Sequence, residues 1–341
     1  MSSSSSASST SRLAKEKFKR LIIDHNGDAD HQDVKDALDE LVRLGKEERN
    51  KKERARRNKA RTKSGEKNGE DSITDDATEV DNGRWSPAQS MEMNAGRWRA
   101  ITTPPFPGKI TSDDSSTDDG KSRFTLGRMS FNMFKPTKLV CAVEDIINII
   151  RPVDAATEGN LLLSDIIKST RNASGDIPAW TQTYHIQVTM EIETPTMNLP
   201  AKLTNYGFCF PEKPALLGVK FCEGKLEPGF DMSCPNSAAM AVAWKETFDC
   251  AVAKDAYTQS YLSKVGTWLT HKVMYMLMGL EPPCDSVDYT QTYKIGRPYV
   301  GQFEFVYFDK DLRVTKGNRG TVVVVERVWT RLIGERTYIV V

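Results

Sequence analysis

Few side chains of this chain have the types and spacing that catalysis requires. Its four histidines are His25 and His31 near the N-terminus, His185 in an alternating segment, and His271 beside Lys272. None of them belongs to an HxxE, HExxH or Gly-x-Ser-x-Gly pattern, the contexts of common metallo- and serine hydrolases. The histidines alone therefore indicate no reaction.

Two carboxylates come closer to a catalytic arrangement. Glu191 and Glu193 are two residues apart in the same alternating segment, so their side chains would leave one strand face about 7 Å apart, a separation that paired-carboxylate chemistry can use. A solvated strand face explains the same pattern with fewer assumptions. The glycines of residues 296–301 (GRPYVG) lack the spacing of a phosphate loop. We therefore predict that the protein is not an enzyme.

No metal or cofactor is predicted either. The segment Asp24–Asp30 (DHNGDAD) starts like a calcium loop, but it has Ala29 where glycine is needed and Lys35 where a glutamate belongs, so it is interpreted as a turn. Six cysteines lie in mostly apolar surroundings without a CxxC pair, as expected of buried, reduced thiols in an intracellular protein. No apolar leader follows Met1, so we expect a protein that is not secreted.

Basic side chains give the strongest functional signal. The net charge is only +1, but residues 43–67 hold twelve Lys or Arg against four Glu. Such a run would attract RNA phosphates, the surface of an anionic membrane, or a nuclear import receptor, and a solubilising charged tract is the alternative. Residues 51–63 contain no aromatic side chain for base stacking, so sequence-specific RNA recognition is not expected. The candidate phosphate-, lipid- or RNA-binding residues are Lys51, Lys52, Arg54, Arg56, Arg57, Lys59, Arg61 and Lys63.

Two further motifs suggest partner docking. A Gly-Arg-Trp tripeptide ends at Trp85 and again at Trp98, and exposed tryptophans in a polar segment often mark a contact surface. Residues 102–107 (TTPPFP) form an extended, polyproline-like stretch suited to an aromatic-lined groove. Packing on the globular region is the alternative for both. The candidate docking residues are Trp85, Trp98, Pro104, Pro105, Phe106 and Pro107.

The elements that must position these residues begin with a charged arm, residues 1–63. Its Ser-rich leader is predicted to be disordered. One short amphipathic helix is predicted from Ser11 and another from Asp30 or Asp33, and the two would pair as a hairpin or associate with another chain. The basic run after Gly45 would be a solvated helix or coil. The predicted apolar face of the second helix consists of Val34, Leu38, Leu41 and Val42.

Residues 123–341 are predicted to be a globular assembly domain, separated from the arm by a disordered linker at 64–122. Its most regular segment is 180–194 (WTQTYHIQVTMEIET), whose strict alternation predicts an antiparallel strand with one face on the core. Before it we expect a strand from Phe124 to Phe134 and helices at Pro136–Ile150 and Asn160–Arg171. After it we expect a loop and then a strand at Ala215–Lys225.

The second part of this domain suggests a repeat, because TQTY recurs at residues 290–293. We expect a short apolar element at Ala238–Ala243, helices at Glu246–Lys254 and Tyr261–Met278, strands at Tyr293–Phe308 and Thr321–Trp329, and an edge strand at Thr337–Val341. Two related β-α-α-β-β halves, 123–230 and 231–341, are one hypothesis, and a single continuous domain is the other. The predicted fold class is α+β: an antiparallel sheet with packed helices, preceded by a long, disordered or helical, charged N-terminal arm.

This organisation resembles the matrix proteins of negative-strand RNA viruses, particularly the rhabdovirus type. The resemblance covers residues 124–225, about a third of the chain. It consists of an order of elements: FTLGRMSFNMF as a strand, TKLVCAVEDIINII and LLLSDIIKS as helices, then WTQTYHIQVTMEIET and ALLGVKFCEG as strands. That family also carries a lysine-rich N-terminal arm followed by a Pro-Pro-x-Tyr budding motif. This chain has Pro104-Pro105-Phe106-Pro107 after its arm.

The resemblance implies a non-enzymatic viral structural protein of the virion and the host cytoplasm, with the nucleus or the inner membrane face as further locations. It would self-associate through residues 124–341 and bridge an anionic membrane to the nucleocapsid or its RNA. Two alternatives remain: a viral coat or movement protein that binds single-stranded nucleic acid, and a cellular scaffold or adaptor. A jelly-roll coat protein would need about eight strands with few helices.

Overall fold

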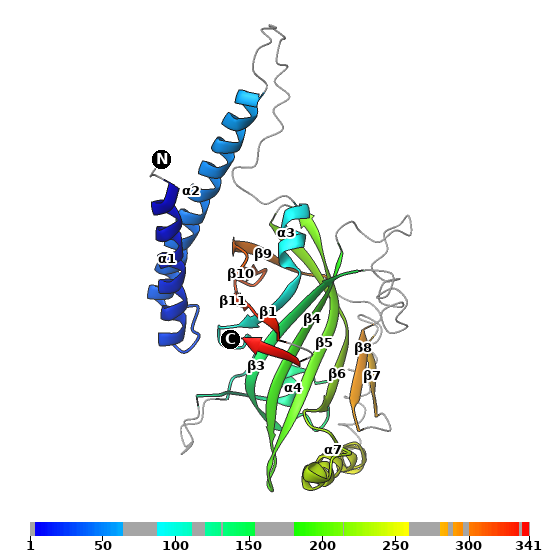
Figure 1. The fold of residues 1–341 in the computed structure, drawn as a ribbon. Helices are drawn as coiled ribbons and strands as arrows, with labels where there is room; N and C mark the ends of the chain where they lie inside the picture. Colours follow the sequence, from blue (N-terminus) through cyan, green and yellow to red (C-terminus); the bar gives the residue numbers. More distant parts are fainter. Residues whose placement is uncertain are drawn as a thin grey trace, which may run out of the picture.

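An eight-stranded antiparallel barrel organises the protein (Figure 1). The computed structural model describes residues 4–63, 87–110, 120–130, 132–153, 181–213, 215–258, 280–285, 289–295, 300–333 and 336–340. In order around the barrel, the strands are β1 (Gly96–Ala100), β3 (Val140–Pro152), β4 (Gln182–Glu193), β5 (Asn198–Lys213), β6 (Leu216–Pro228), β9 (Val300–Phe308), β10 (Leu312–Gly317) and β11 (Val322–Arg327), and β11 pairs with β1 to close it. Neighbouring barrel strands follow one another along the chain. This up-and-down order differs from the Greek-key order of a jelly roll.

The predicted fold class is confirmed in outline, since helices pack on an antiparallel sheet. The described elements do not follow the order of two β-α-α-β-β halves. Strands from both proposed halves, β3 to β6 and β9 to β11, join one closed sheet.

The alternating segment 180–194 forms β4, as predicted. From Val188 onward the burial alternates, with Val188, Met190 and Ile192 buried and the residues between them partly exposed. One face of β4 therefore points into the core, as a barrel strand requires.

The helix predicted at Pro136–Ile150 is wrong, because Val140–Pro152 is strand β3. β3 pairs with β4 along its length and with β1 on its other side, so it lies well inside the sheet. Most of its apolar residues are β-branched valines and isoleucines, which favour strands. A register shift between Val143 and Asp145 breaks the alternation, and an apolar run without alternation cannot be distinguished from a helix by periodicity.

The loop expected before residue 215 is mostly β5, a strand of 16 residues. Two prolines conceal it in the sequence. Pro200 is close to the start of β5, and Pro211 lies beyond Cys209, the last β5 residue paired with β4. Prolines are tolerated near strand ends, where one side of the ladder is unused. β6 confirms the strand predicted at Ala215–Lys225.

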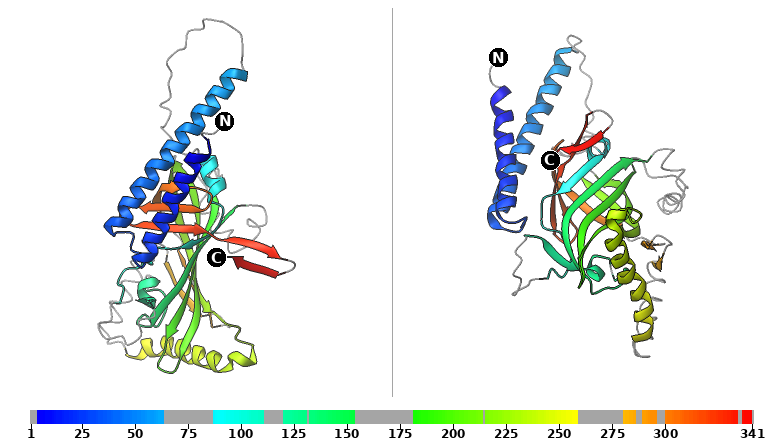
Figure 2. Two further views of the ribbon diagram at one scale, coloured as in Figure 1. Left: turned by 60° about the vertical axis from the view of Figure 1, so that its left-hand side comes forward. Right: turned by 60° about the horizontal axis from the view of Figure 1, so that its bottom comes forward.

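Shorter elements extend the barrel. β2 (Ser122–Thr125) pairs with β3 and is followed by α4 (Leu126–Met129), so the strand predicted to Phe134 ends at Thr125. β7 (Leu280–Asp285) and β8 (Gln291–Ile295) form a hairpin beside β6, and β8 and β9 together replace the single strand predicted at Tyr293–Phe308. β11 confirms the strand predicted from Thr321. β12 (Trp329–Ile333) and β13 (Arg336–Val340) form a separate two-stranded sheet that projects from the barrel (Figure 2).

A helix lies near each end of the barrel (Figures 1 and 2). α3 (Pro87–Asn94) buries Met91 and Asn94 at one end. At the other end η1 (Pro235–Ser237) leads into α7 (Ala238–Thr258), whose Trp244 and Phe248 join the core, and α7 contains the helix predicted at Glu246–Lys254. The predicted helices Asn160–Arg171 and Tyr261–Met278 lie outside the described residues.

The N-terminal arm is a helical hairpin on the outer face of β9, β10 and β11 (Figure 2). α1 (Ser4–Asp24) starts within the Ser-rich leader that was predicted to be disordered, and α2 (Gln32–Lys63) runs through the basic tract. The predicted apolar face of the second helix is confirmed. The core shared by the hairpin and the barrel contains Phe18, Ile22, Val34, Ala37, Leu38, Leu41, Tyr307, Leu312, Val314 and Val324.

Candidate nucleic-acid interface

α2 has two halves with different roles. Its N-terminal half buries Val34, Leu38 and Leu41 against α1 and the barrel. Gly45 lies close to the barrel, because a Cβ at this position would lie 3.0 Å from the Cε2 atom of Tyr307. Beyond this point α2 continues to Lys63, past the end of the barrel (Figures 1 and 2).

The sequence explains why α2 does not end where its apolar face ends. Residues 46–63 contain neither Gly nor Pro and consist mainly of Lys, Arg, Glu and Ala, which are good helix formers. At the junction, Arg43 lies 2.7 Å from Glu40 and 2.6 Å from Glu47, at i,i+3 and i,i+4 spacing. Such pairs stabilise a helix by a few tenths of a kcal/mol each, about 0.2–0.5.

The projecting half collects the predicted basic residues on one continuous helix. Between Lys51 and Lys63, eight positive charges and one negative charge leave a net charge of +7. At a rise of about 1.5 Å per residue, these charges lie along roughly 18 Å. This is one net positive charge per ~2.6 Å, comparable with one phosphate per ~3.4 Å of a nucleic-acid strand. Residues 51–63 therefore form a positively charged helical segment, called the basic rod below.

The cleft between α1 and the barrel has a volume of about 870 Å³ and many charged side chains in its lining. Two of its lysines are paired across it. Lys15 lies 3.0 Å from Asp309 and 3.0 Å from Asp311, and Lys19 lies 2.7 Å from Glu326. These ion pairs attach α1 to the barrel, so the cleft is best described as an electrostatic contact surface.

The pKa values of the central pair show how strongly it is held. Burial lowers the pKa of Lys15, but its hydrogen bonds to Asp309 and Asp311 and their charges outweigh burial and raise it overall. Burial raises the pKa of Asp309, but backbone N–H groups of Asp311 and Leu312 and the Lys15 ammonium outweigh it and lower it overall. Both groups are therefore held in their charged forms.

The carboxylates considered for catalysis have structural partners. Glu191 accepts a hydrogen bond from Lys121 at 3.0 Å, and Glu193 accepts one from Arg123 at 2.8 Å. These two ion pairs hold β2 and the residue before it against β4. His185 lies edge-on to Tyr206, with ring centroids 4.9 Å apart, and burial together with the charge of Arg151 lowers its pKa to about 4. None of these contacts forms an acid–base pair.

The predicted docking residues are not gathered in one site. Trp98 is fully buried inside the barrel, so its predicted docking role is wrong, and β1 shows that residues 96–100 are not linker. Phe106 packs edge-on against Phe124, with centroids 5.5 Å apart, which anchors the proline-rich stretch to the barrel. Pro105 and Pro107 are exposed and Pro104 is partly exposed, whereas Trp85 lies outside the described residues.

A buried polar network was missed by sequence reasoning. Arg313 on β10 is 1% exposed; its Nη1 donates to Oδ1 of Asn94 at 2.6 Å, and its guanidinium lies 5.1 Å from the Trp98 ring. In the described part of the chain, its Nε has no hydrogen-bond partner. Asn94 also donates to Gln182 at 3.3 Å. An arginine within a strand is normally predicted to be exposed, so the sequence does not indicate that Arg313 is buried in a polar network.

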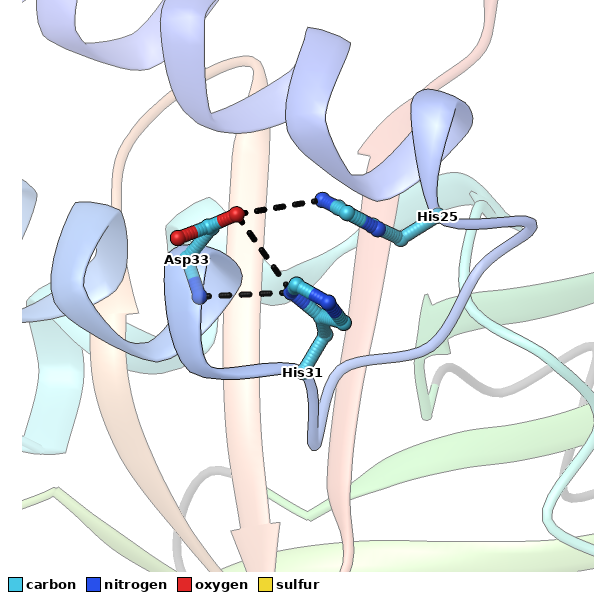
Figure 3. Close-up of side chains that lie close together, drawn as sticks. All are labelled: His25, His31 and Asp33. Carbon is cyan, nitrogen blue, oxygen red and sulfur yellow. Dashed lines mark hydrogen bonds and ion pairs between the residues drawn. The ribbon is translucent and has the colours of Figure 1, made fainter.

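One side-chain cluster has the chemistry of a metal site: His25, His31 and Asp33, in the turn between α1 and α2 (Figure 3). In the sequence, this segment was compared only with a calcium loop. The close spacing of His25, His31 and Asp33 in the sequence is the signal that could have indicated a metal site.

Comparisons with protein-family models, with curated proteins and with solved structures found no match. Among the described helices, none combines the length and the apolar character needed to cross a membrane.

Proposed function

We propose that the protein is a non-enzymatic binder of single-stranded nucleic acid, in the class of viral coat and movement proteins, and that residues 51–63 of α2 are its binding element. The observation that carries the proposal is the continuous basic helix, which extends past the end of the barrel (Figure 1). Binding by charge alone implies little preference for sequence, as the lack of aromatic residues in this segment also indicates.

The distribution of the basic positions favours a nucleic acid over a membrane. They follow one another at intervals of one or two residues and do not form a single stripe at helical spacing. A helix that lies on a membrane normally has an apolar face opposite its basic one, and residues 51–63 offer only two alanines. A flexible nucleic-acid strand can wrap around the helix and contact basic residues on several sides, whereas a flat membrane surface contacts the residues on one side only.

The matrix-like function implied by the sequence resemblance uses the same residues with a membrane as the target. Part of its basis was a helix at residues 137–150 (TKLVCAVEDIINII), most of which is strand β3 in the structure. We therefore prefer the nucleic-acid function and treat membrane bridging as an outcome of the test.

The test compares two variants of equal charge by fluorescence anisotropy with a labelled, unstructured RNA. In the first, the eight basic residues between Lys51 and Lys63 become Gln, which keeps helix propensity. In the matched control, eight exposed basic residues elsewhere become Gln: Lys17, Arg20, Lys109, Arg128, Lys138, Lys245, Lys316 and Arg319.

The proposal expects the first variant to lose at least about 100-fold in affinity, since each neutralised phosphate contributes to binding by counterion release. The control variant should lose far less. Equal losses in both variants would mean that only the overall charge matters. Flotation with anionic liposomes, together with no RNA binding by the wild-type protein, would replace the proposal with the matrix-like function.

A coat protein and a movement protein differ in self-association. The β12–β13 hairpin is the described element best placed for it, because its outer edges pair with no other described strand. Sedimentation velocity separates the two functions: a coat protein would assemble into large, regular particles with RNA, and a movement protein would form open complexes along it.

A further inference from the structure

The turn between α1 and α2 brings two imidazoles and a carboxylate together (Figure 3). Nε2 of His25 lies 3.6 Å from Oδ2 of Asp33, and Nδ1 of His31 lies 3.7 Å from the same oxygen. The two rings are stacked, with centroids 3.5 Å apart and planes 16° from parallel. One ligand atom from each residue lies within 4.8 Å of the other two. Of the residues that the structure describes, only these form such a group.

The backbone of the turn fixes this arrangement. Asn26 and Gly27 adopt positive φ values of 52° and 79°, which end α1 and reverse the chain. His25 at the end of α1 then faces the start of α2. The turn is held on the barrel side, because the backbone N–H and the hydroxyl of Thr103 donate to the carbonyls of Gly27 and Asn26, at 2.8 and 3.0 Å.

Hydrogen bonding does not account for the cluster. Both histidine–carboxylate distances exceed the range of about 2.7–3.2 Å that such hydrogen bonds occupy. Three polar groups thus converge on one point without a good hydrogen bond between their side chains. A cation between them would satisfy all three.

We propose that His25, His31 and Asp33 bind a divalent transition-metal ion of the zinc type. Two imidazole nitrogens and one carboxylate oxygen suit zinc, whereas magnesium and calcium prefer oxygen ligands alone. Three protein ligands leave a fourth position for water, which the partial exposure of the cluster permits.

The tautomer of His31 is the one that this site requires. The backbone N–H of Asp33 donates to Nδ1 of His31 at 3.3 Å, so Nδ1 carries a lone pair and no proton. This contact is long, and an ion at about 2.0–2.1 Å would replace it. Because the stacked rings are nearly parallel, both would have to rotate toward Asp33 for their nitrogens to coordinate the same ion.

A metal here would connect the end of α1 to the start of α2. It would therefore fix the angle of the hairpin that carries the basic rod. The site does not depend on what that rod binds.

The test uses the tag-free full chain at pH 7.5 with Zn²⁺ in calorimetry and Co²⁺ in visible absorption. We expect one equivalent to bind, Co²⁺ to show ligand-field bands of a low-coordinate site, and Zn²⁺ to raise the unfolding temperature. His25→Gln and His31→Gln should each weaken binding by at least about tenfold. Asp30→Asn, which removes a carboxylate from the same turn, should leave it unchanged.

Circular dichroism of the variants establishes that they fold. The proposal fails if the wild-type protein binds neither ion at micromolar concentration, or if either histidine variant binds as tightly as the wild type.

Discussion

Nζ of Lys15 lies 3.0 Å from Oδ2 of Asp309, joining the middle of α1 to the turn between β9 and β10. The side chain of Lys15 is 14% exposed, so this ion pair is largely shielded from water. Because α1 packs against α2, the pair contributes, together with the apolar contacts of both helices, to the position of α2 on the barrel.

Asp309→Asn should therefore loosen the hairpin. Oδ1 of Asp309 accepts hydrogen bonds from the backbone of Asp311 and Leu312, at 2.8 and 2.7 Å, and an asparagine keeps that acceptor. The substitution removes the charge and also replaces Oδ2, which accepts hydrogen bonds from Lys15 at 3.0 Å and from Tyr307 at 2.9 Å, so it should cost at least about 1.5–3 kcal/mol, the range for charged hydrogen bonds. Urea unfolding at pH 7 measures it. Asp311→Asn is the matched control and should cost less, because Asp311 is more exposed.

The same pair predicts an acid limit for the docked hairpin. The pKa of native Asp309 lies below its ordinary value of about 3.9, so the unfolded state binds this proton first. The stabilisation is present above pH ~4 and is lost as the pH falls through the native pKa. The protection factors of the α1 amides, which correct for the slower intrinsic exchange in acid, should therefore fall at pH 3 in the wild type. Asp309→Asn should show much less of this change, and an equal fall in protection in both proteins would contradict the account.

His185 predicts a second pH dependence. Its native pKa of about 4 is lower than the unfolded value of about 6.5, so between these values the unfolded state takes up a proton that the native state does not. Native stability should fall by up to about 3 kcal/mol as the pH drops through this window. His185→Phe keeps a ring beside Tyr206 and should remove that dependence from the unfolding free energy. A wild-type stability that does not change over the same window would refute the role of His185.

Substitutions of Arg313 and Asn94 should have non-additive effects on the free energy of unfolding. Asn94→Leu leaves the buried guanidinium without its 2.6 Å hydrogen bond and should cost about 3–5 kcal/mol. Arg313→Met removes the charge and leaves the Asn94 amide oxygen without its donor, at about 1–3 kcal/mol. The double variant should cost less than the sum of the two, and strict additivity in urea unfolding would show that the contact is not energetically coupled.

The sequence predicted those elements whose burial follows one period. β4 alternates along most of its length, and the N-terminal half of α2 has Val34, Leu38 and Leu41 on one face. Both were recognised because each has one buried side and one polar side.

The closed barrel was not predictable in the same way. β3 is apolar without alternation and β5 contains two prolines, so one was interpreted as a helix and the other as a loop. Closure depends on β1, five residues inside a segment that is polar in composition. Its buried Trp98 was interpreted as exposed because its pairing partners, Arg327 and Asn148, are far away in the chain.

The candidate site was also predictable only in part. The basic residues of the rod were identified from composition, which needs no long-range information. Composition left open whether these residues lie on a coil or on a helix. It also left open where that helix sits, because its position depends on long-range contacts such as that of Gly45 with Tyr307.

The salt dependence of RNA binding tests the central claim most directly. For a single strand, the slope of log K against log salt is about −0.7 per phosphate neutralised, so eight contacts predict a slope of about −5.6. The wild-type protein should show this slope, and the protein with Gln at the eight basic positions of residues 51–63 should show one close to zero. A shallow slope in the wild type, or the same slope in both proteins, would contradict the assignment of α2 as the nucleic-acid-binding element.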